Sequence, residues 1–300
     1  MIPAIPILAQ VGDFGVWHAH PDTWLLVALI GVAYALAVVR LGPRFAEPGH
    51  AAVTRRQVVC FALGLGAIWI ASDWPIHDVA ERSMYSVHMV QHLLLSMVAT
   101  PLLLLGTPGW LGRWVLRPPS LAFRAVRRLS RFLPAIIVFN VVLVLTHWPL
   151  VVNASLDHHW LHFWVHALIM LSSVIVWMPV LSPLPEIPRL APPVRAAFLF
   201  LQSIVPTVPA SFLTFGAHPL YKFYVGKPHL WGLSSLEDQQ VAGLIMKLGA
   251  GLLLWMLIAV IFFRWAADED RHGEPQRLQR ELERELAKID TVSVDEGMRR

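Results

Sequence analysis

The sequence predicts an all-α, polytopic membrane protein: a seven-helix transmembrane bundle with its N-terminus outside and its C-terminus in the cytoplasm. Three observations predict this fold. Hydrophobic residues make up 56% of the 300-residue chain and charged residues 15%, below the roughly 25% charge of soluble domains. Several apolar runs approach the ~20 residues that cross a bilayer as a helix, and the mean hydropathy is +0.57. Basic residues concentrate in alternate loops between these runs.

Seven segments are apolar enough to be spans. They are residues 23–39, 58–74, 85–105, 133–150, 161–180, 196–215 and 241–263. The fourth ends in His147, Trp148 and Pro149, and the sixth contains Pro206 and Pro209. Membrane helices tolerate proline when neighbouring groups satisfy the freed carbonyls. The two prolines of the sixth span therefore predict a kink or a short unwound section.

The distribution of basic residues gives the orientation, because short cytoplasmic loops are enriched in Lys and Arg. Residues 1–22 contain neither. The first, third and fifth loops carry Arg40, Arg44, Arg55 and Arg56, then Arg113, Arg117, Arg124, Arg127, Arg128 and Arg131, then Arg189 and Arg195. The second loop has only Arg82, the fourth has none, and the sixth has two lysines beside two acids. We therefore expect an outer N-terminal segment (1–22), a seven-span membrane domain (23–265) and a cytoplasmic tail (266–300).

We expect no catalytic role for the two ends of the chain. The N-terminus lacks the basic region of a cleavable signal peptide. In the tail, helical spacing of Leu278, Leu282, Leu286 and Ile289 predicts a short amphipathic helix on the bilayer or against a partner. The net charge of +4 follows from the membrane topology, so no nucleic-acid partner is expected.

The histidines are distributed unevenly across the predicted membrane. Of fourteen, only His50 and His272 fall on the cytoplasmic side, which leaves twelve near the outer side. The third span carries two of these and the fifth span begins with four, namely His88 and His92, then His158, His159, His162 and His166. Side chains four residues apart share one helix face. Ionisable or metal-binding groups inside a membrane helix are costly and indicate a function.

Two such faces at similar depth can converge on one metal ion. The predicted ligands are His88, His92, His162 and His166, and imidazole suits copper, zinc and iron. Thioethers at the same depth favour Cu(I), and they are those of Met84, Met89 and Met246. The lone Cys60 excludes both an internal disulfide and a paired-cysteine metal motif. The two faces also lack the glutamates of di-iron centres and of HExxH zinc proteases.

Other interpretations of these residues stay open. One histidine from each helix could hold a haem, and the histidines could relay protons or form a structural network. A lone His147 is typical of a hydrogen-bonding partner between helices. Four more are typical of loops, namely His18, His20, His218 and His229. At the seventh span, Ser234 or Ser235 fits a helix N-cap, whereas Asp238 and Gln239 either complement the helix dipole or orient a ligand histidine.

The ordered set of motifs resembles the multi-pass CtaG-type cytochrome c oxidase assembly factors. The motifs are His88-x-x-Gln91-His92, Pro101-Leu102-x-x-x-Gly106-x-Pro108, His162-x-x-x-His166, Trp177-x-Pro179 with Pro183, Pro219-Leu220-Tyr221 and Asp238-Gln239-Gln240-x-x-Gly243-x-x-Met246. Together they cover about residues 20–265. The chain does not resemble the single-span, cysteine-containing copper chaperone that shares the CtaG name.

The resemblance implies a multi-pass protein of the bacterial plasma membrane that matures a haem–copper oxidase. We expect a non-enzymatic assembly factor that binds copper at the outward-facing histidines and assists its delivery. Its expected partners are oxidase subunits, a periplasmic copper carrier and the bilayer. The expected accessory residues are Gln91, Asp238, Gln239, Met89, Met246, His158 and His159. The alternatives from other classes are a haem b redox subunit and a histidine-based proton or ion pathway.

Overall fold

The computed structural model describes residues 17–46 and 51–271, and all regular structure in these ranges is helical. Among the described residues, six helices are long and apolar enough to cross a membrane, and they are Pro21–Phe45, Arg55–Arg82, Tyr85–Gly106, His159–Leu181, Pro192–Phe215 and Ser235–Arg271. A seventh span results if the bent pair of α9 (Leu121–Leu129) and α10 (Phe132–Thr146) is counted as one. The protein is therefore a multi-pass, all-helical membrane protein. The predicted tail helix, His50 and His272 lie outside the described residues.

Several spans contain more than one helical element. The first joins α2 (Pro21–Leu36) to a π-turn and α3 (Gly42–Phe45), and the second joins α4 (Arg55–Ser72) to α5 (Ile76–Arg82). The third runs from α6 (Tyr85–Leu93) through a π-turn (Leu94–Ala99) into α7 (Thr100–Gly106). The last begins with α15 (Ser235–Leu244). Short helices connect the others, namely α8 (Gly109–Leu116), α11 (Pro149–Asp157) and the 3₁₀ turns Lys222–Tyr224 and Leu230–Gly232.

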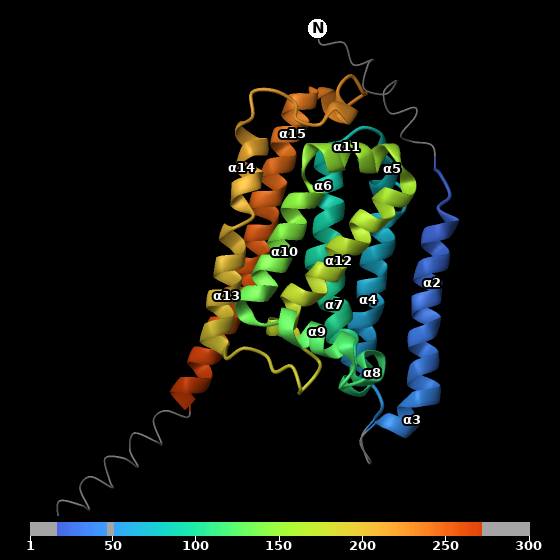
Figure 1. Ribbon diagram of the computed structural model, residues 1–300, viewed down its shortest axis with the longest axis vertical. Helices are drawn as coiled ribbons and strands as arrows, with labels where there is room; N and C mark the ends of the chain where they lie inside the picture. The colour runs from blue at the N-terminus through green and yellow to red at the C-terminus, as the bar shows by residue number, and fades with distance from the viewer. Residues whose placement is uncertain (1–16, 47–50, 272–300) are drawn as a thin grey trace, which may run out of the picture.

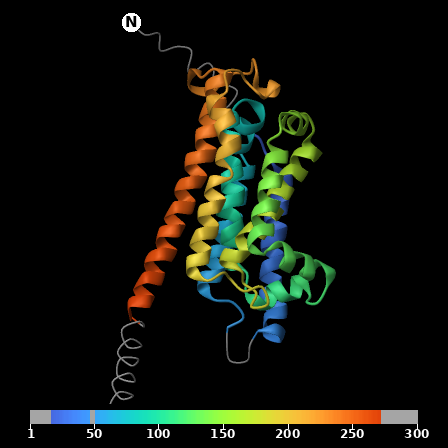
Figure 2. The same ribbon diagram turned by 60° about the vertical axis from the view of Figure 1, so that its left-hand side comes forward.

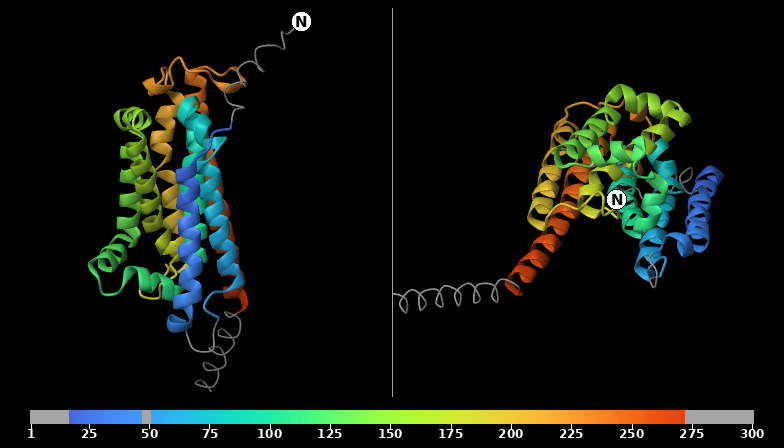
Figure 3. Two further views of the ribbon diagram at one scale, coloured as in Figure 1. Left: turned by 90° about the vertical axis from the view of Figure 1, so that its right-hand side faces the viewer. Right: turned by 60° about the horizontal axis from the view of Figure 1, so that its bottom comes forward.

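The fourth predicted span, 133–150, is corrected by the structure. Helix α10 ends at Thr146, and Pro149 opens α11 instead of continuing α10. Proline disfavours helical geometry in the residue before it, and Trp148 is indeed extended. With 15 residues, α10 is about 22 Å long and shorter than a bilayer core. At its other end it meets α9 at a 92° bend, visible in Figure 3 (left).

The sixth predicted span has the expected interruption. Helix α13 (Pro192–Ile204) and helix α14 (Thr207–Phe215) are separated by a break at Val205 and Pro206. The predicted kink is confirmed, and its cause is the missing N–H of proline. Pro209 lies within the first turn of α14, where a helix lacks internal partners for its N–H groups.

The central helix Tyr85–Gly106 packs against α4, α12 (His159–Leu181) and α15, whereas α2 stands at the edge of the bundle against α4 (Figure 1; Figure 3, right). Gly106 shows how closely α7 and α4 approach. A Cβ added there would lie 2.5 Å from the backbone nitrogen of Phe61. Small residues allow membrane helices to pack at this distance.

The two ends of the bundle differ in composition. Helices α3, α8 and α9, which carry Arg44, Arg113, Arg124, Arg127 and Arg128, lie at one end, and α5, α11 and the start of α15 lie at the other (Figures 1 and 2). The predicted His-x-x-x-His faces belong to the α5 end, because α6 and α12 both begin there (Figure 1). The fold thus gathers imidazoles and arginines at opposite ends.

Candidate metal centre

Asp238 fixes the start of the helix that carries His88 and His92. It is fully buried, and its carboxylate accepts hydrogen bonds from the backbone N–H groups of Tyr85 (2.6 Å) and Ser86 (3.3 Å) and from the Ser86 hydroxyl. A negative charge at a helix N-terminus satisfies free N–H groups and complements the helix dipole. The sequence allowed Asp238 to orient a ligand imidazole. Its hydrogen bonds are with the first turn of α6, and its Oδ2 also lies 4.0 Å from Nε2 of His229.

A second set of contacts fixes α12 against this helix. The Trp177 indole of α12 donates a hydrogen bond to the Ser96 carbonyl, over 2.9 Å. The Ser96 hydroxyl in turn donates to the His92 carbonyl, over 2.6 Å. These bonds lie in the π-turn Leu94–Ala99, which begins two residues after His92. Such π-turns inside α-helices occur frequently at functional sites.

The structure brings the four predicted imidazoles together between α6 and α12. The ring centroids of His88 and His92 lie 4.3 Å apart, and those of His162 and His166 lie 4.2 Å apart. Across the helices, His92 and His166 are separated by 5.0 Å, and His88 and His162 by 5.6 Å. The i, i+4 spacing in each helix and the facing of the two helices together produce this cluster.

Three of these residues form a group with metal-site dimensions, here called the histidine triad: His88, His92 and His166. One nitrogen from each lies within 4.8 Å of the others, and the Nε2 atoms of His92 and His166 are 3.1 Å apart. The Nδ1 atoms of His88 and His92 are buried without a hydrogen-bond partner. Buried polar atoms normally have hydrogen-bond partners, so these two unpartnered nitrogens are consistent with a bound ligand at this site.

The fourth predicted ligand, His162, lies in a different group with a carboxylate, here called the mixed triad: His77, Glu81 and His162. Its ligand atoms also lie within 4.8 Å of one another. His77 and Glu81 lie between the second and third predicted spans, where a loop was expected, but residues 76–82 form α5. The missed signal is their spacing of four residues, the same as in both His-x-x-x-His faces.

A small cavity borders His92 of the histidine triad. It measures about 40 Å³. Its lining includes two histidines and three methionines, namely His92, His147, Met89, Met97 and Met246. Met89 and Met246 are buried in one apolar cluster. The His147 ring lies 5.2 Å from that of His92 and contacts the Leu143 carbonyl through Nδ1, over 2.7 Å. Thioethers therefore surround this side of His92.

The remaining predicted accessory residues lie around the two triads. The Gln91 amide donates to the Ala71 carbonyl (2.8 Å) and contacts Nδ1 of His77 (3.1 Å). Gln239 accepts from the Leu220 N–H (2.6 Å), within the loop that precedes α15. His158 and His159 are exposed at the start of α12, and Nδ1 of His159 is 4.0 Å from Glu81.

The loop before α15 covers this end of the bundle. Ser234 is the N-cap of α15 in a capping box with Glu237, which confirms the predicted cap. His229, expected to be a plain loop residue, is buried. The Tyr221 hydroxyl donates to the His147 carbonyl over 3.0 Å. Burial raises the pKa of Tyr221 to about 12, so the phenol keeps its proton and remains a donor.

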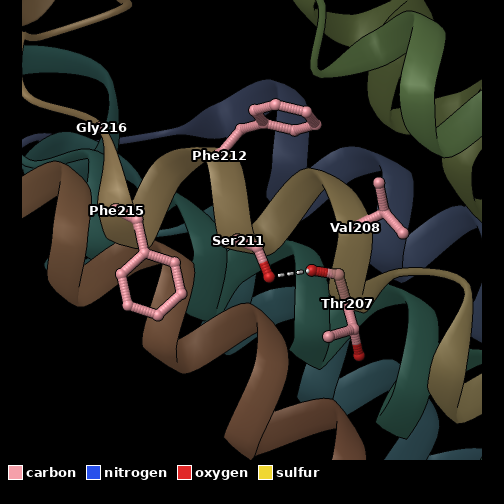
Figure 4. A pocket seen from close by; sticks show the side chains of 6 residues that line it. All are labelled: Thr207, Val208, Ser211, Phe212, Phe215 and Gly216. Atoms are coloured by element: carbon pink, nitrogen blue, oxygen red, sulfur yellow. Dashed lines mark hydrogen bonds between the residues drawn. The ribbon is translucent and has the colours of Figure 1, made fainter.

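A separate hollow on α14 has a different character. It is lined by Thr207, Val208, Ser211, Phe212, Phe215 and Gly216 (Figure 4). Within it, the Ser211 hydroxyl donates a hydrogen bond to the Thr207 carbonyl. None of these six side chains is titratable or a metal ligand. Phe212 and Phe215 are largely exposed, as expected of a surface that faces lipid.

Comparison with known proteins gives one family and two relatives. The family model described as cytochrome c oxidase caa3 assembly factor (Caa3_CtaG) matches residues 32–268. An uncharacterized protein of Mycobacterium bovis and one of Mycobacterium tuberculosis are each 24% identical over 291 residues. The alignments cover 87% of this chain and 43% of each relative, so the chain spans less than half of their length. No solved structure matches the chain.

Proposed function

The chain belongs to the cytochrome c oxidase caa3 assembly factor family, and from this we propose that it binds copper at His88, His92 and His166 and assists its delivery to a haem–copper oxidase. The proposed role is that of a non-enzymatic assembly factor, with copper as its cargo. The observation that carries the proposal is the histidine triad itself, in which two ring nitrogens are buried without a partner.

The donor set favours Cu(I). Three neutral imidazoles add no charge to the membrane interior, and a monovalent cation costs less to bury there than a divalent one. Met89 and Met246 lie beside His92 in the small cavity, and thioethers are soft donors. Three imidazoles leave a coordination position open, which permits a copper carrier to deliver the ion and an oxidase subunit to take it.

The orientation follows from the distribution of charge. Under the positive-inside rule, the end with α3, α8 and α9 faces the cytoplasm, and the triad end faces outward in a bacterial plasma membrane. Helix α9 supports this placement, because its nearly perpendicular course lets Arg124, Arg127 and Arg128 meet the inner surface. The copper site then lies in the outer half of the membrane, on the side of a periplasmic copper carrier and of the outer part of an oxidase subunit.

A haem between the two helices fits these distances poorly. Two axial imidazoles on one iron place their nitrogens about 4 Å apart with the macrocycle between them. The Nε2 atoms of His92 and His166 are 3.1 Å apart, and the cavity beside His92 measures only about 40 Å³. A Soret band in the purified protein would contradict the copper proposal.

A proton pathway is a second candidate function, and one observation favours it. Imidazoles follow one another from the α5 end inward, with centroid separations of 4.9 Å (His20–His77), 6.0 Å (His77–His162), 4.2 Å (His162–His166), 5.0 Å (His166–His92) and 5.2 Å (His92–His147). Such a row can relay protons. This function predicts pH-dependent proton flux in liposomes and no stoichiometric copper.

Complementation of a deletion strain tests the proposed function. We expect loss of caa3-type oxidase activity, partial rescue by added copper, and full rescue by the wild-type gene. The His92→Ala/His166→Ala variant should not rescue at low copper. His218→Ala is the matched control, because His218 is exposed in a loop, and it should rescue fully. Full rescue by the double variant at wild-type protein levels would overturn the proposal.

A further inference from the structure

The mixed triad is a second cluster of ligand atoms, and it shares no residue with the histidine triad. We propose that His77, Glu81 and His162 form a separate binding site for a borderline divalent cation, of the class of Zn(II) and Cu(II). This inference does not require copper at the histidine triad.

Helix α5 and helix α12 bring the three side chains together. His77 and Glu81 stand one turn apart on α5 and contact His162 at the start of α12, with the His77 and His162 ring centroids 6.0 Å apart. Contacts on other sides hold α5 in place. Asp78 lies 2.9 Å from His20 and 3.2 Å from Arg82, and the Tyr224 hydroxyl donates to the Ala80 carbonyl over 2.8 Å. The site is thus built on a fixed element.

The distances match those of ligands around one ion. Oε1 of Glu81 lies 3.0 Å from Nε2 of His162 and 3.4 Å from Nε2 of His77. Imidazole and carboxylate ligands bind Zn²⁺ at about 2.0–2.2 Å, which places neighbouring ligand atoms about 3 to 3.5 Å apart. The two distances from Glu81 therefore fit one cation, and because all three ligand atoms lie within 4.8 Å of one another, a shift of one imidazole ring can complete the set.

The state of His162 points independently to a ligand. His162 is 4% exposed, and neither of its ring nitrogens has a hydrogen-bond partner. This holds although Oε1 of Glu81 is only 3.0 Å from Nε2 of His162. The ring and the carboxylate therefore lie close without the direction of a hydrogen bond. A cation between them would satisfy Nε2 of His162 and the charge of Glu81 together.

Gln91 determines which nitrogen of His77 faces the site. Its amide contacts Nδ1 of His77 over 3.1 Å and leaves Nε2 toward Glu81. A histidine that binds metal through Nε2 carries its proton on Nδ1 and needs an acceptor there. A terminal amide offers both a donor and an acceptor, and Oε1 of Gln91 is buried without a partner. In the structure the donor Nε2 of Gln91 faces Nδ1 of His77, so binding of a cation at Nε2 of His77 requires the amide to turn, to present Oε1 to Nδ1 and to give up its hydrogen bond to the Ala71 carbonyl.

The mixed triad differs from the histidine triad in charge and access. The side chains of His77 and Glu81 are each 17% exposed, whereas His88 and His92 are buried. The carboxylate offsets part of a divalent charge, which an all-imidazole set cannot do. These features select a harder ion at a more accessible position.

Zn(II) titration of the purified full-length protein tests this site. The variant is Glu81→Gln, which keeps the side-chain size and removes the charge. We expect its Zn(II) affinity to fall by at least the roughly 10- to 100-fold seen when a metal site loses an outer-shell partner. Glu186→Gln, at the arginine-rich end, is the matched control and should bind as wild type.

A second measurement keeps the test independent of folding and of the copper proposal. In Cu(II)-loaded protein, electron paramagnetic resonance should report mixed nitrogen and oxygen ligation that changes in Glu81→Gln, while Cu(I) affinity remains that of wild type. Unchanged Zn(II) binding and an unchanged Cu(II) spectrum in Glu81→Gln would overturn the second site. Loss of Cu(I) affinity alone in the same variant would also overturn it, because the two sites would then be one.

Discussion

The histidine triad and the mixed triad are built from the same helix and the same spacing, yet they offer different chemistry. Helix α12 contributes His166 to the first and His162, one turn earlier, to the second. The neighbouring element decides the rest: α6 supplies two buried imidazoles, and α5 supplies a partly exposed imidazole and a carboxylate. In our proposal, a single helical turn thus separates a copper site made of imidazoles alone from a site for a harder ion that includes a carboxylate.

The largest expected effect comes from the two neighbouring histidines of α12. His166→Ala should lower Cu(I) affinity by at least about 100-fold, more than an outer-shell loss, and leave Zn(II) affinity unchanged. His162→Ala should lower Zn(II) affinity by a similar factor and leave Cu(I) affinity unchanged. Competitive titration of both ions against each variant makes the measurement. If both variants lost Cu(I) equally, the four histidines would form one site and the comparison would fail.

Asp238→Ala should have the next largest effect, and it acts on one triad only. It removes a buried carboxylate that satisfies the first turn of α6, which should destabilise the protein by about 3 kcal/mol. The start of α6 positions His88 and His92, so Cu(I) binding should weaken with stability. Thermal unfolding measures the first effect, and Glu269→Gln, which is exposed in the last span, is the control. Wild-type stability in Asp238→Ala would show that α6 does not depend on this cap.

Met89→Leu and Met246→Leu should sharpen the comparison by a smaller amount. Leucine has a similar volume, so each change should cost less than about 1.5 kcal/mol of stability. The loss of thioethers beside His92 should reduce Cu(I) affinity several-fold without affecting Zn(II). Titration of the double variant with both ions measures this. An equal loss for both ions would indicate a packing effect instead of a donor effect.

The smallest expected effect lies at the opposite end of the bundle. The hydrogen bond from Arg113 lowers the pKa of Glu186 below its ordinary 4.5. Its stabilising contribution is therefore complete above pH 4.5 and is lost as the pH falls through the lowered pKa. For this exposed pair the contribution should be below about 1 kcal/mol. Unfolding curves of wild type and Glu186→Gln should converge at low pH, and a difference that persists would contradict this assignment.

The sequence predicted those features that depend on local pattern. Apolar runs located the helices, Pro206 located the break between α13 and α14, and Ser234 was one of two proposed caps of α15. The spacing of His88 and His92 predicted one shared helix face. Each of these follows from the chain's own periodicity or from the chemistry of a single residue.

The features that depend on the rotation and packing of helices could not be predicted. Periodicity does not say that His162 lies beside both His88 of α6 and His77 of α5, so the sequence predicted four histidines around one ion and no second group with Glu81. Asp238 lies 153 residues from Tyr85 in sequence, and nothing local indicates that its carboxylate caps α6. Glu81 was missed because its segment was taken for a loop, although His77 and Glu81 have helical spacing.

The central claim is that His88, His92 and His166 bind copper, and copper analysis of the purified protein tests it most directly. Wild type and His218→Ala, reconstituted with Cu(I) and freed of excess, should each retain one tightly bound copper ion. His92→Ala/His166→Ala, at equal folding and purity, should retain none at the same competitor concentration. Equal copper content in all three proteins would contradict the claim.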